Sequence, residues 1–218
     1  MDQLKTSRQE TRLWYDRISR WYDLFSQPWE GPARAVGLQM LAIQPGEKVL
    51  EIGPGTGHGL VALARAAGLS GRVYGLDLSP GMLAITQKRL HNLITSDNVM
   101  LLVADATCLP FPGKSFDALF ASFVIELFEP DEISFLLNGC HELLHTGGRL
   151  CAVSMTRTGP SLLIRPLYEW AQRRFPRLID CRPIYLSKAL ESAGFEIQAS
   201  ARRSSLDLPV EIVLAAKA

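Results

Sequence analysis

The residues best suited to chemistry are the glycines of the segment VLEIGPGTGHG, residues 49–59. Gly53, Gly55 and Gly57 stand between a short apolar run and an alanine-rich run, and glycines at such a strand-to-helix turn let the backbone approach a ligand closely. The dinucleotide-binding pattern would place its third glycine at position 58, where this chain has histidine. The spacing therefore disfavours a nicotinamide oxidoreductase, which stays open as an alternative.

Three carboxylates accompany this loop along the sequence. Glu51, inside the first strand pattern, would repel a pyrophosphate and suits a ligand that offers an ammonium group or hydroxyls. Asp77 ends the second strand pattern, 20 residues after Gly57, where a carboxylate can accept hydrogen bonds from both ribose hydroxyls. Asp105 and Ala106 follow the third strand pattern, where an acceptor can meet an adenine amino group. Together these positions predict one site for a nucleoside at the carboxyl ends of neighbouring strands.

An alternation of strand and helix patterns must position these side chains. Apolar runs indicate strands at 48–53, 72–78, 99–105, 116–124 and 149–155, and helical periodicity indicates helices at 58–68, 79–93 and 131–148. A helix at 186–195 and strands at 196–202 and 210–218 follow. Ser79 as N-cap and Pro80 at the first helical position mark the start of the second helix. Strands and helices alternating at this spacing predict an α/β fold with a parallel sheet covered on both faces.

The composition limits the classes of function. The 218 residues include 23 basic and 22 acidic side chains, so no net field favours nucleic acid as a partner. No apolar run reaches the length of a membrane-spanning helix, and the first fourteen residues contain no apolar core of a secretory signal. The four cysteines lie far apart without a CxxC pair, which is typical of reduced thiols. We therefore expect one cytoplasmic domain.

Four segments together resemble a known family: VLEIGPGTG, GLDLSPGML (75–83), VADATCLPFPGKSFDAL (103–119) and ELLHTGGRL (142–150). They are similar to the class I S-adenosylmethionine-dependent methyltransferases, and LPFPGKSFD resembles the branch typified by the UbiE/MenG quinone C-methyltransferases. The resemblance implies a Rossmann-like seven-stranded sheet with its last strand antiparallel. It also implies a division of the single domain, residues 1–218, into an N-terminal helical lid (1–45), a cofactor-binding core (46–155), a substrate-cover insert after strand five (156–185) and a C-terminal helix with strands (186–218).

The resemblance also implies the cofactor, S-adenosylmethionine, and its product, S-adenosylhomocysteine. The glycines would pack under the methionine part, with Glu51 near its ammonium group and Asp77 on the ribose. The segment YDRISRWYDLF (15–25) resembles a family segment whose tyrosine closes over the cofactor, and Tyr22 is the better match. A tyrosine ring beside a sulfonium is worth on the order of 1 kcal/mol. The implied cofactor-binding residues are Tyr22, Glu51, Gly53, Gly55, Thr56, Gly57, Asp77, Leu78, Met82, Asp105, Ala106, Ser122 and Phe123.

Methyl transfer from a sulfonium is an in-line displacement, which needs a base only if the acceptor must lose a proton. Glu126, just beyond the fourth strand pattern, is the best placed catalytic residue, with Tyr22 beside the cofactor. Asp180 and Tyr185 come next as bases. Alternatively, Glu126 is a surface acid at the start of the next helix, where a negative charge suits the helix dipole. His58 is either a base near the cofactor or a solvent-facing helix residue.

The string HELLH at 141–145 matches the HExxH pattern of zinc hydrolases. That chemistry needs both histidines to face the site with the glutamate as base. Apolar residues instead occupy the buried face of the predicted helix and leave the histidines on its solvent side: Ile133, Leu136, Leu137, Cys140, Leu143 and Leu144. We therefore expect no metal site.

Two aromatic segments, roughly 11–30 and 156–185, should form the acceptor side, since they hold all four tryptophans. Residues 156–183 contain six arginines against two acids, a balance of +4. The second segment is either a lid for an apolar acceptor, with arginines meeting a phosphate or an anionic membrane surface, or a buried helix with a solvated charged side. The candidate substrate residues are Trp21, Tyr168, Arg182 and Tyr185.

The sequence thus predicts methyl transfer to a small hydrophobic or lipid-like acceptor, such as a quinone-type carbon or a phospholipid amine. The segment FPRLIDCRPIYL (175–186) does not match the corresponding region of the quinone enzymes, so the resemblance by itself does not assign a quinone as the acceptor. A catalytically silent protein that binds S-adenosylmethionine and acts through a partner is the alternative from another class.

Overall fold

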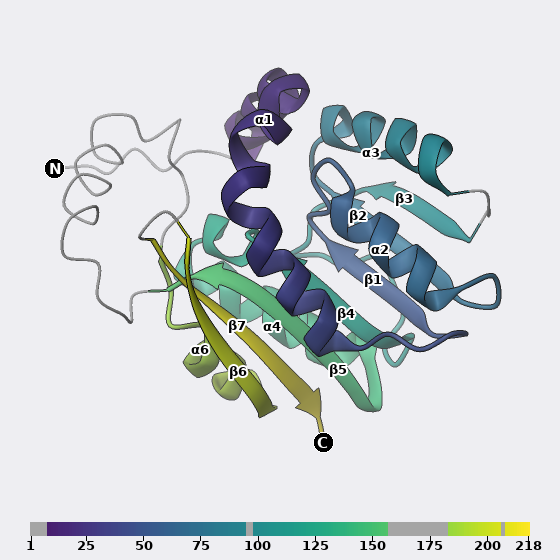
Figure 1. Cartoon of the computed structure of the whole chain (residues 1–218). Helices are drawn as coiled ribbons and strands as arrows, with labels where there is room; N and C mark the ends of the chain where they lie inside the picture. The colour runs from purple at the N-terminus through teal and green to yellow at the C-terminus, as the bar shows by residue number, and fades with distance from the viewer. Residues whose placement is uncertain (1–7, 95–97, 157–182, 206–207) are drawn as a thin grey trace, which may run out of the picture.

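The computed structural model describes residues 8–94, 98–156, 183–205 and 208–218. Its helices are α1 (Arg8–Leu41), α2 (His58–Ala67), α3 (Pro80–Leu93), α4 (Pro130–Leu143) and α6 (Leu186–Ser192), with a short 3-10 helix η1 (Ile125–Leu127). Its strands are β1 (Lys48–Ile52), β2 (Arg72–Asp77), β3 (Val99–Val103), β4 (Phe116–Ser122), β5 (Leu144–Met155), β6 (Phe195–Ser205) and β7 (Leu208–Lys217). Figure 1 shows their arrangement.

The strands form one seven-stranded sheet in the order β3-β2-β1-β4-β5-β7-β6. Strands β1 to β5 pair in parallel, whereas β7 runs antiparallel to both β5 and β6. The order reverses between β1 and β4, which brings the carboxyl ends of both strands to the edge where such folds bind ligands. The predicted α/β class and the predicted antiparallel last strand are both confirmed.

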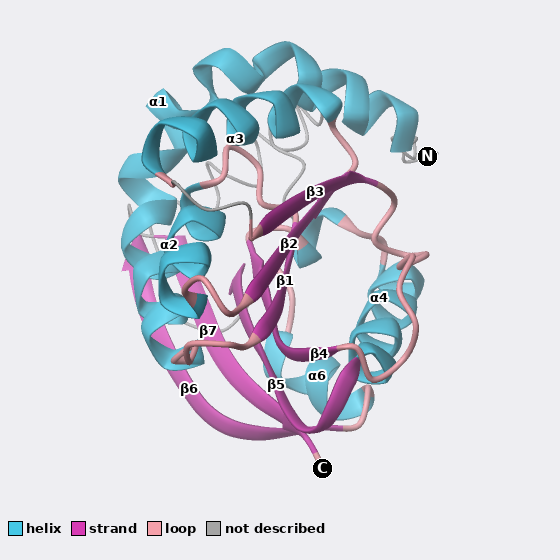
Figure 2. Ribbon diagram, turned by 90° about the vertical axis from the view of Figure 1, so that its right-hand side faces the viewer, coloured by secondary structure: helices cyan, strands magenta, loops and turns pink. Residues whose placement is uncertain are grey.

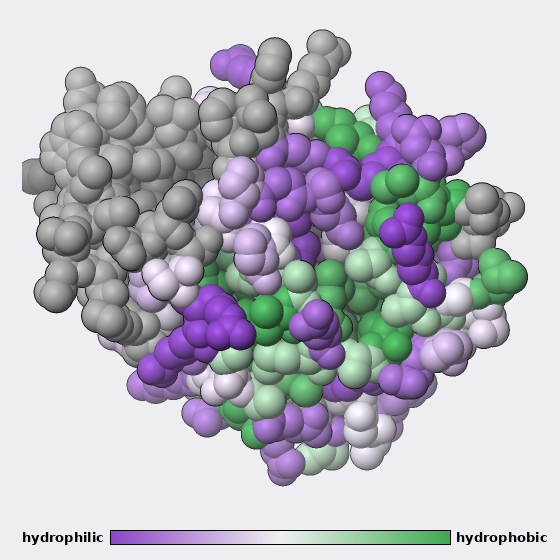
Figure 3. All heavy atoms as spheres, in the orientation of Figure 1, coloured by the Kyte–Doolittle hydropathy of each residue, from purple (hydrophilic) through white to green (hydrophobic). Residues whose placement is uncertain are grey.

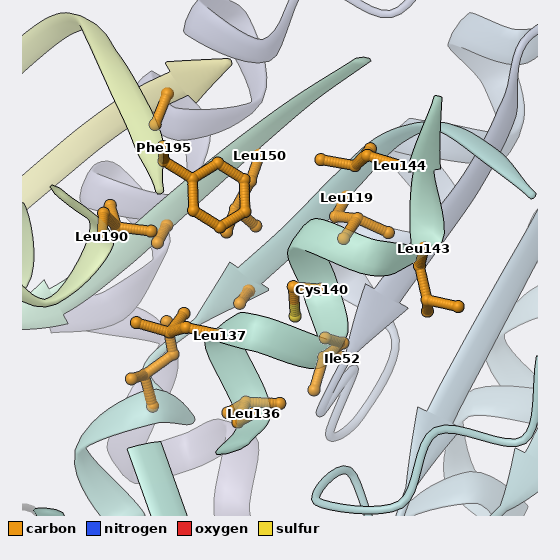
Figure 4. Packing of buried hydrophobic residues seen from close by; sticks show 14 of the residues in the cluster. Ile52, Leu119, Leu136, Leu137, Cys140, Leu143, Leu144, Leu150, Leu190 and Phe195 are labelled. Carbon is orange, nitrogen blue, oxygen red and sulfur yellow. The ribbon is translucent and has the colours of Figure 1, made fainter. Parts of the chain in front are cut away.

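Helices cover both faces of the sheet, with α1, α2 and α3 on one side and α4 and α6 on the other (Figure 2). The strand pleat explains this division, since successive side chains point to opposite faces. Val49 packs in the cluster under α1 and α2, while its neighbour Leu50 packs in the cluster under α4. In Figure 4, Leu136 and Leu137 of α4 lie in this second cluster together with Leu150 of β5.

The prediction of a helix over 131–148 is wrong at its C-terminal end. Helix α4 ends at Leu143, and β5 begins at Leu144, opposite Phe116 of β4. Gly147 has a φ of +76°, and a Cβ on Gly148 would lie 2.9 Å from the carbonyl oxygen of His145. Gly147 and Gly148 thus form a tight turn within β5, and the positive φ of Gly147 is incompatible with a continuing α-helix.

The same boundary removes the HExxH interpretation. His141 lies in the last turn of α4, but His145 lies on β5, so the two histidines do not share a helix face. His141 packs edge-on against Phe195, with ring centroids 5.1 Å apart. No group of three or more His, Cys, Asp and Glu side chains in the described part of the chain could hold a metal ion.

Helix α1 is a single element of 34 residues with Pro28 and Pro32 inside it. None of the described helices is both long and apolar enough to cross a lipid bilayer. On the molecular face seen in Figure 1, hydrophobic residues are interspersed with hydrophilic ones (Figure 3). Helix α1 contacts α2, α3 and the strands β4, β5, β6 and β7.

Arg149, in the middle of β5, holds the C-terminal end of α1. Its Nε donates to the carbonyl oxygen of Leu41 (2.7 Å), and its Nη2 donates to that of Ala42 (3.1 Å). The same guanidinium pairs with Glu47, with Nη1 2.7 Å from Oε1 and Nη2 2.8 Å from Oε2. One side chain thus satisfies terminal carbonyls that an α-helix leaves without partners.

Replacing Arg149 by alanine should lower the free energy of unfolding by about 1–3 kcal/mol, because it removes a charge-assisted cap and leaves Glu47 unpaired. Urea denaturation followed by circular dichroism measures this change. Arg72→Ala, at an exposed position on β2, is the control and should change the stability by less than about 0.5 kcal/mol. Equal effects of the two substitutions would contradict the assigned role of Arg149.

Candidate functional site

The glycine loop between β1 and α2 is packed too closely for side chains. Gly53 has a φ of +64°, and a Cβ there would lie 2.6 Å from Val124 beyond β4. Gly57 has a φ of +87°, and a Cβ there would lie 2.7 Å from Thr86 of α3. Both positions combine a left-handed backbone with a close neighbour, which only glycine tolerates. The loop therefore presents its backbone to the edge of the sheet.

Glu51 of β1 is buried beneath this loop with 2% of its surface exposed, and its Oε2 has no hydrogen-bond partner among the described residues. Gly59 makes room for the carboxyl group, since a Cβ there would lie 2.1 Å from Oε1. Burial raises the pKa of Glu51 to about 8; the positive charge of Arg34 opposes this effect, and the negative charge of Asp77 adds to it. A cationic group placed here would stabilise the carboxylate.

Asp77, at the end of β2, ties the glycine loop to the start of α3. Its Oδ2 accepts a hydrogen bond from the Gly55 N–H (3.1 Å), and its Oδ1 accepts one from the Ser79 N–H (2.9 Å). Burial raises the pKa of Asp77 to about 6, against the lowering effect of these bonds. Ser79 caps α3 as predicted, accepting from the Met82 N–H at 3.1 Å. Leu78 lies between Asp77 and Ser79 and is half-buried.

The residues expected at the adenine and beside the sulfonium lie at the ends of β3 and β4. Asp105 Oδ1 accepts from both the N–H (2.9 Å) and the hydroxyl (2.8 Å) of Thr107, which makes it part of a local turn. Ala106 is buried, and Ser122 has a buried hydroxyl without a hydrogen-bond partner among the described residues. Phe123 has a φ of +56° and meets the Trp29 ring edge-on, with centroids 4.9 Å apart.

Glu126 is fully buried in η1, so its interpretation as a surface acid is wrong. Its Oε1 accepts from the Met155 N–H at 3.1 Å, and its Oε2 has no hydrogen-bond partner in the described part of the chain. Burial raises the pKa of Glu126 to about 7, and the nearby Glu30 adds to this effect. The helix that follows begins later, with a capping box formed by Glu129 and Glu132.

Helix α1 joins this site through two aspartates spaced seven residues apart, which places them on the same helix face. Asp16 Oδ1 accepts from the Ser79 hydroxyl (2.5 Å) and from the Gly81 N–H (2.8 Å). Asp23 accepts from the hydroxyl of Thr56 and pairs with Arg89. The N-terminal half of α1 is therefore fastened to the glycine loop and to α3.

His58, at the start of α2, is a member of this fastening network. Its Nε2 lies 3.3 Å from Asp23 Oδ2, and its Nδ1 lies 3.1 Å from Arg89 Nη1. Arg89 also donates from Nε to the Thr56 carbonyl oxygen at 2.7 Å. Burial lowers the pKa of His58, and Arg89 lowers it further, against the opposing charge of Asp23. Neither of the two interpretations offered for His58 anticipated this role.

Asp16, Asp23 and Arg89 are site residues that were not predicted from the sequence. A signal was present, since the dipeptide Tyr-Asp occurs at 15–16 and again at 22–23. That repeat drew attention to the tyrosines, whereas the aspartates make the contacts described above.

The acceptor-side residues are described only in part. Trp21 and Tyr22 lie on α1, but their side chains are outside the described residues, as are Tyr168, Asp180 and Arg182 in the insert. Tyr185 is 53% exposed and precedes α6, next to the bridge between Thr156 and Ile184. The described site can therefore bind a ligand through buried carboxylates and backbone groups, while its acceptor face stays a prediction.

Comparison with known proteins agrees with this geometry. The profile of a family described as a methyltransferase domain matches residues 49–148. Demethylmenaquinone methyltransferase of Tropheryma whipplei (strain Twist) is 30% identical over 193 residues, covering 84% of this chain and 76% of that protein. Aklanonic acid methyltransferase DauC of Streptomyces sp. (strain C5) is 32% identical over 143 residues, covering 64% of this chain and 62% of that protein.

Among solved structures, an S-adenosylmethionine-dependent methyltransferase from Aquifex aeolicus superposes with a TM-score of 0.66 at 20% identity. The superposition covers 93% of this chain and 98% of that one. At this identity the likeness concerns the fold alone, which it extends over nearly the whole of both chains.

The buried carboxyl groups should make the ligand-free protein less stable as the pH rises. The pKa of Glu51 is about 8 when folded and near 4.3 when unfolded, so the folded state holds a proton that the unfolded state has lost. Stability from this group is complete below pH 4 and is lost as the pH rises through 8. Glu51→Gln should therefore lie within about 1 kcal/mol of the wild type at pH 5 and exceed it by a few kcal/mol at pH 8.5, since one pKa unit corresponds to about 1.4 kcal/mol.

Glu47→Gln is the matched control. Burial alone would raise the pKa of Glu47, but hydrogen bonds from Arg149 and from the Gln44 N–H lower it overall. Removing that carboxylate should cost stability at both pH values. Urea titrations of the wild type, Glu51→Gln and Glu47→Gln at pH 5 and pH 8.5 measure the free energies of unfolding. A Glu51→Gln variant less stable than the wild type at pH 8.5 would refute the buried, unpaired environment assigned to Glu51.

Proposed function

Because the chain belongs to the class I S-adenosylmethionine-dependent methyltransferases, it transfers a methyl group from that cofactor, and we propose that the acceptor is a small hydrophobic ring of the quinone type, methylated at carbon. The family is established by a relative 30% identical over most of both proteins, together with the matching domain profile. The relatives' names include a demethylmenaquinone methyltransferase and an aklanonic acid methyltransferase. These names describe the substrates of the relatives, and they support the proposal of a similar methyl acceptor for this chain.

The residues of the site fit the cofactor. Glu51 offers a buried oxygen without a hydrogen-bond partner among the described residues to the ammonium group, and Asp77 offers two oxygens near the positions that ribose hydroxyls would take. A Cβ on Gly55 would meet no other atom within 4 Å, so the loop is open there for a close approach of the methionine part. The cofactor supplies a methyl group already activated on a sulfonium. The protein then has to align donor and acceptor and exclude water, and orientation of this kind supplies roughly 7–11 kcal/mol of a barrier.

The observation that carries the acceptor proposal is the carboxyl group of Glu126. A ring carbon that gains a methyl group must lose its proton, and that proton needs a base. Glu126 Oε2 would accept the ring proton when the carbon takes the methyl group in place of the sulfur. A base works best with a pKa close to the working pH, and the pKa of Glu126 is about 7. Met155 fixes the other carboxyl oxygen through its N–H.

Asp77→Ala should weaken binding of S-adenosylhomocysteine by about 1–3 kcal/mol, because a carboxylate that accepts hydrogen bonds from ribose is lost. Isothermal titration calorimetry measures this affinity directly. Asp131→Ala, at an exposed position on α4, is the control with the same change of charge. Unchanged affinity in Asp77→Ala would show that the ribose lies elsewhere.

The proposed reaction is tested with methyl-labelled S-adenosylmethionine and two purified acceptors: a reduced naphthoquinone with a short isoprenoid chain, and phosphatidylethanolamine vesicles. Label should enter the naphthoquinol, and kcat should rise with pH through about 7 as Glu126 loses its proton. Glu126→Gln should lower kcat by about 10²- to 10⁴-fold while binding of S-adenosylhomocysteine persists. Glu142→Gln, which changes an exposed residue of α4, should leave kcat unchanged.

Three results would overturn parts of this proposal. Label in the phospholipid alone would reassign the acceptor to an amine. A Glu126→Gln variant with full activity would remove the base. Cofactor binding without a methylated product from either acceptor would contradict the quinone-type assignment.

A further inference from the structure

Two leucines are exposed at the C-terminal ends of α2 and α3. Leu69, in the turn that follows α2, is 82% exposed, and Leu93, the last residue of α3, is 49% exposed. Arg65 of α2 joins the two helix ends, since its Nη2 donates to the Leu93 carbonyl oxygen at 3.3 Å. In Figure 1 the turn after α2 and the end of α3 lie on the same side of the molecule.

The backbone around Leu69 is held in place by hydrogen bonds. Gly68, with a φ of +66°, donates from its N–H to the Ala64 carbonyl oxygen at 3.2 Å. The Gly68 carbonyl oxygen in turn accepts from the Gly71 N–H (3.3 Å) and from Nδ2 of the buried Asn98 (2.8 Å). An apolar side chain stabilises a fold by leaving water, so the exposed Leu69 side chain on this fixed turn contributes little to the fold.

The charged side chains at this end of the molecule are basic. Helices α2 and α3 contain neither aspartate nor glutamate. Glu47, whose carbonyl oxygen accepts from the Arg72 N–H, pairs through its carboxylate with Arg149. Asp97, the one acid in the sequence from 78 to 104, lies outside the described residues. We call the following exposed residues, together with Leu69 and Leu93, the basic leucine surface: Arg65, Arg72, Lys88 and His91.

The combination of bases with exposed leucines selects among possible partners. A second copy of the chain, related by a two-fold axis, would bring bases against bases, and like charges repel. A stable contact with another protein buries about 800 Å² on each side, which two leucines separated by bases do not supply. A nucleic acid would contact the bases and leave the leucines in water. An anionic lipid bilayer uses both, because its phosphates attract bases and its acyl boundary takes up apolar side chains.

We propose that the basic leucine surface binds an anionic lipid bilayer, with Leu69 and Leu93 entering the headgroup region and the bases contacting lipid phosphates. Helices α2 and α3 begin at the glycine loop and just beyond Asp77, and they have 10 and 14 residues. At 1.5 Å per residue, their C-terminal ends lie roughly 15 Å and 21 Å from those starting points. The bilayer therefore contacts the end of the protein away from the site, which stays open to water. This inference does not depend on the methyl acceptor.

Co-sedimentation of the full chain with lipid vesicles tests the proposal. The wild type should bind phosphatidylglycerol vesicles about 100-fold more tightly than phosphatidylcholine vesicles, because three lysine and arginine side chains face the anionic surface. Raising the salt concentration to about 1 M should remove most of this difference, since salt screens exposed charges. Binding of S-adenosylhomocysteine should be the same with and without vesicles, because the site lies away from the bilayer.

Two variants and two matched controls locate the contact. Arg72→Gln combined with Lys88→Gln should weaken binding to phosphatidylglycerol by about 30-fold. Leu69→Ser should weaken it by about 10- to 100-fold, because the leucine side chain no longer transfers from water into the bilayer. Lys188→Gln, at an exposed position on α6, and Leu13→Ser, at a position 59% exposed on α1, should change it by less than about twofold.

Several results would overturn the proposal. Equal binding to the two lipids, or no binding to phosphatidylglycerol, would exclude an anionic bilayer as the partner. A loss in the Arg72→Gln and Lys88→Gln variant without any loss in Leu69→Ser would indicate a polyanion in solution, such as a nucleic acid. Equal losses in Leu69→Ser and Leu13→Ser would place the contact on another surface. All substituted positions are exposed, so circular dichroism spectra should match the wild type and exclude unfolding as the cause.

Discussion

The structure depends on holding acidic side chains out of water at one edge of a parallel sheet. Glu51 on β1 and Glu126 beyond β4 are buried there, and Asp77 ends β2 on the other side of Glu51, so the unliganded site carries a desolvation cost. The two apolar clusters on either face of the sheet must supply the stability that offsets this cost. A cofactor with an ammonium and a sulfonium group would add positive charge at this edge. Binding and protein stability are therefore linked.

Much of the fold follows from local patterns in the sequence. The strand–helix alternation and the cap at Ser79 involve residues close together in the chain, and both are found in the structure. The end of α4 was misjudged because the apolar periodicity continues into Leu144, while the turn at Gly147 and Gly148 decides the boundary. Periodicity alone cannot distinguish the last turn of a helix from a buried strand that follows at once.

The parts of the site that belong to a sequence motif could be predicted, whereas ion pairs between residues far apart in the sequence could not. The glycine loop, Glu51 and Asp77 lie together at the sheet edge. The pairing of Asp23 with Arg89 joins residues 66 positions apart, and no periodicity relates them. From the sequence, Glu126 has two interpretations, a catalytic base and a surface acid at the start of the next helix, where a negative charge suits the helix dipole. Only the packing of η1 against β5, through the Met155 N–H, shows that it is enclosed.

Helix α1 is fastened at both ends and interrupted in between. Asp16 and Asp23 hold its first half to the glycine loop and α3, and Arg149 holds its last turn to β5. Pro28 and Pro32 lie between these anchors, and each lacks the N–H that would close a helical turn. The middle of the helix therefore has fewer backbone hydrogen bonds than the parts on either side of it. The two halves of α1 are therefore held to the rest of the protein by separate sets of polar contacts, one through Asp16 and Asp23 before the prolines and one through Arg149 after them.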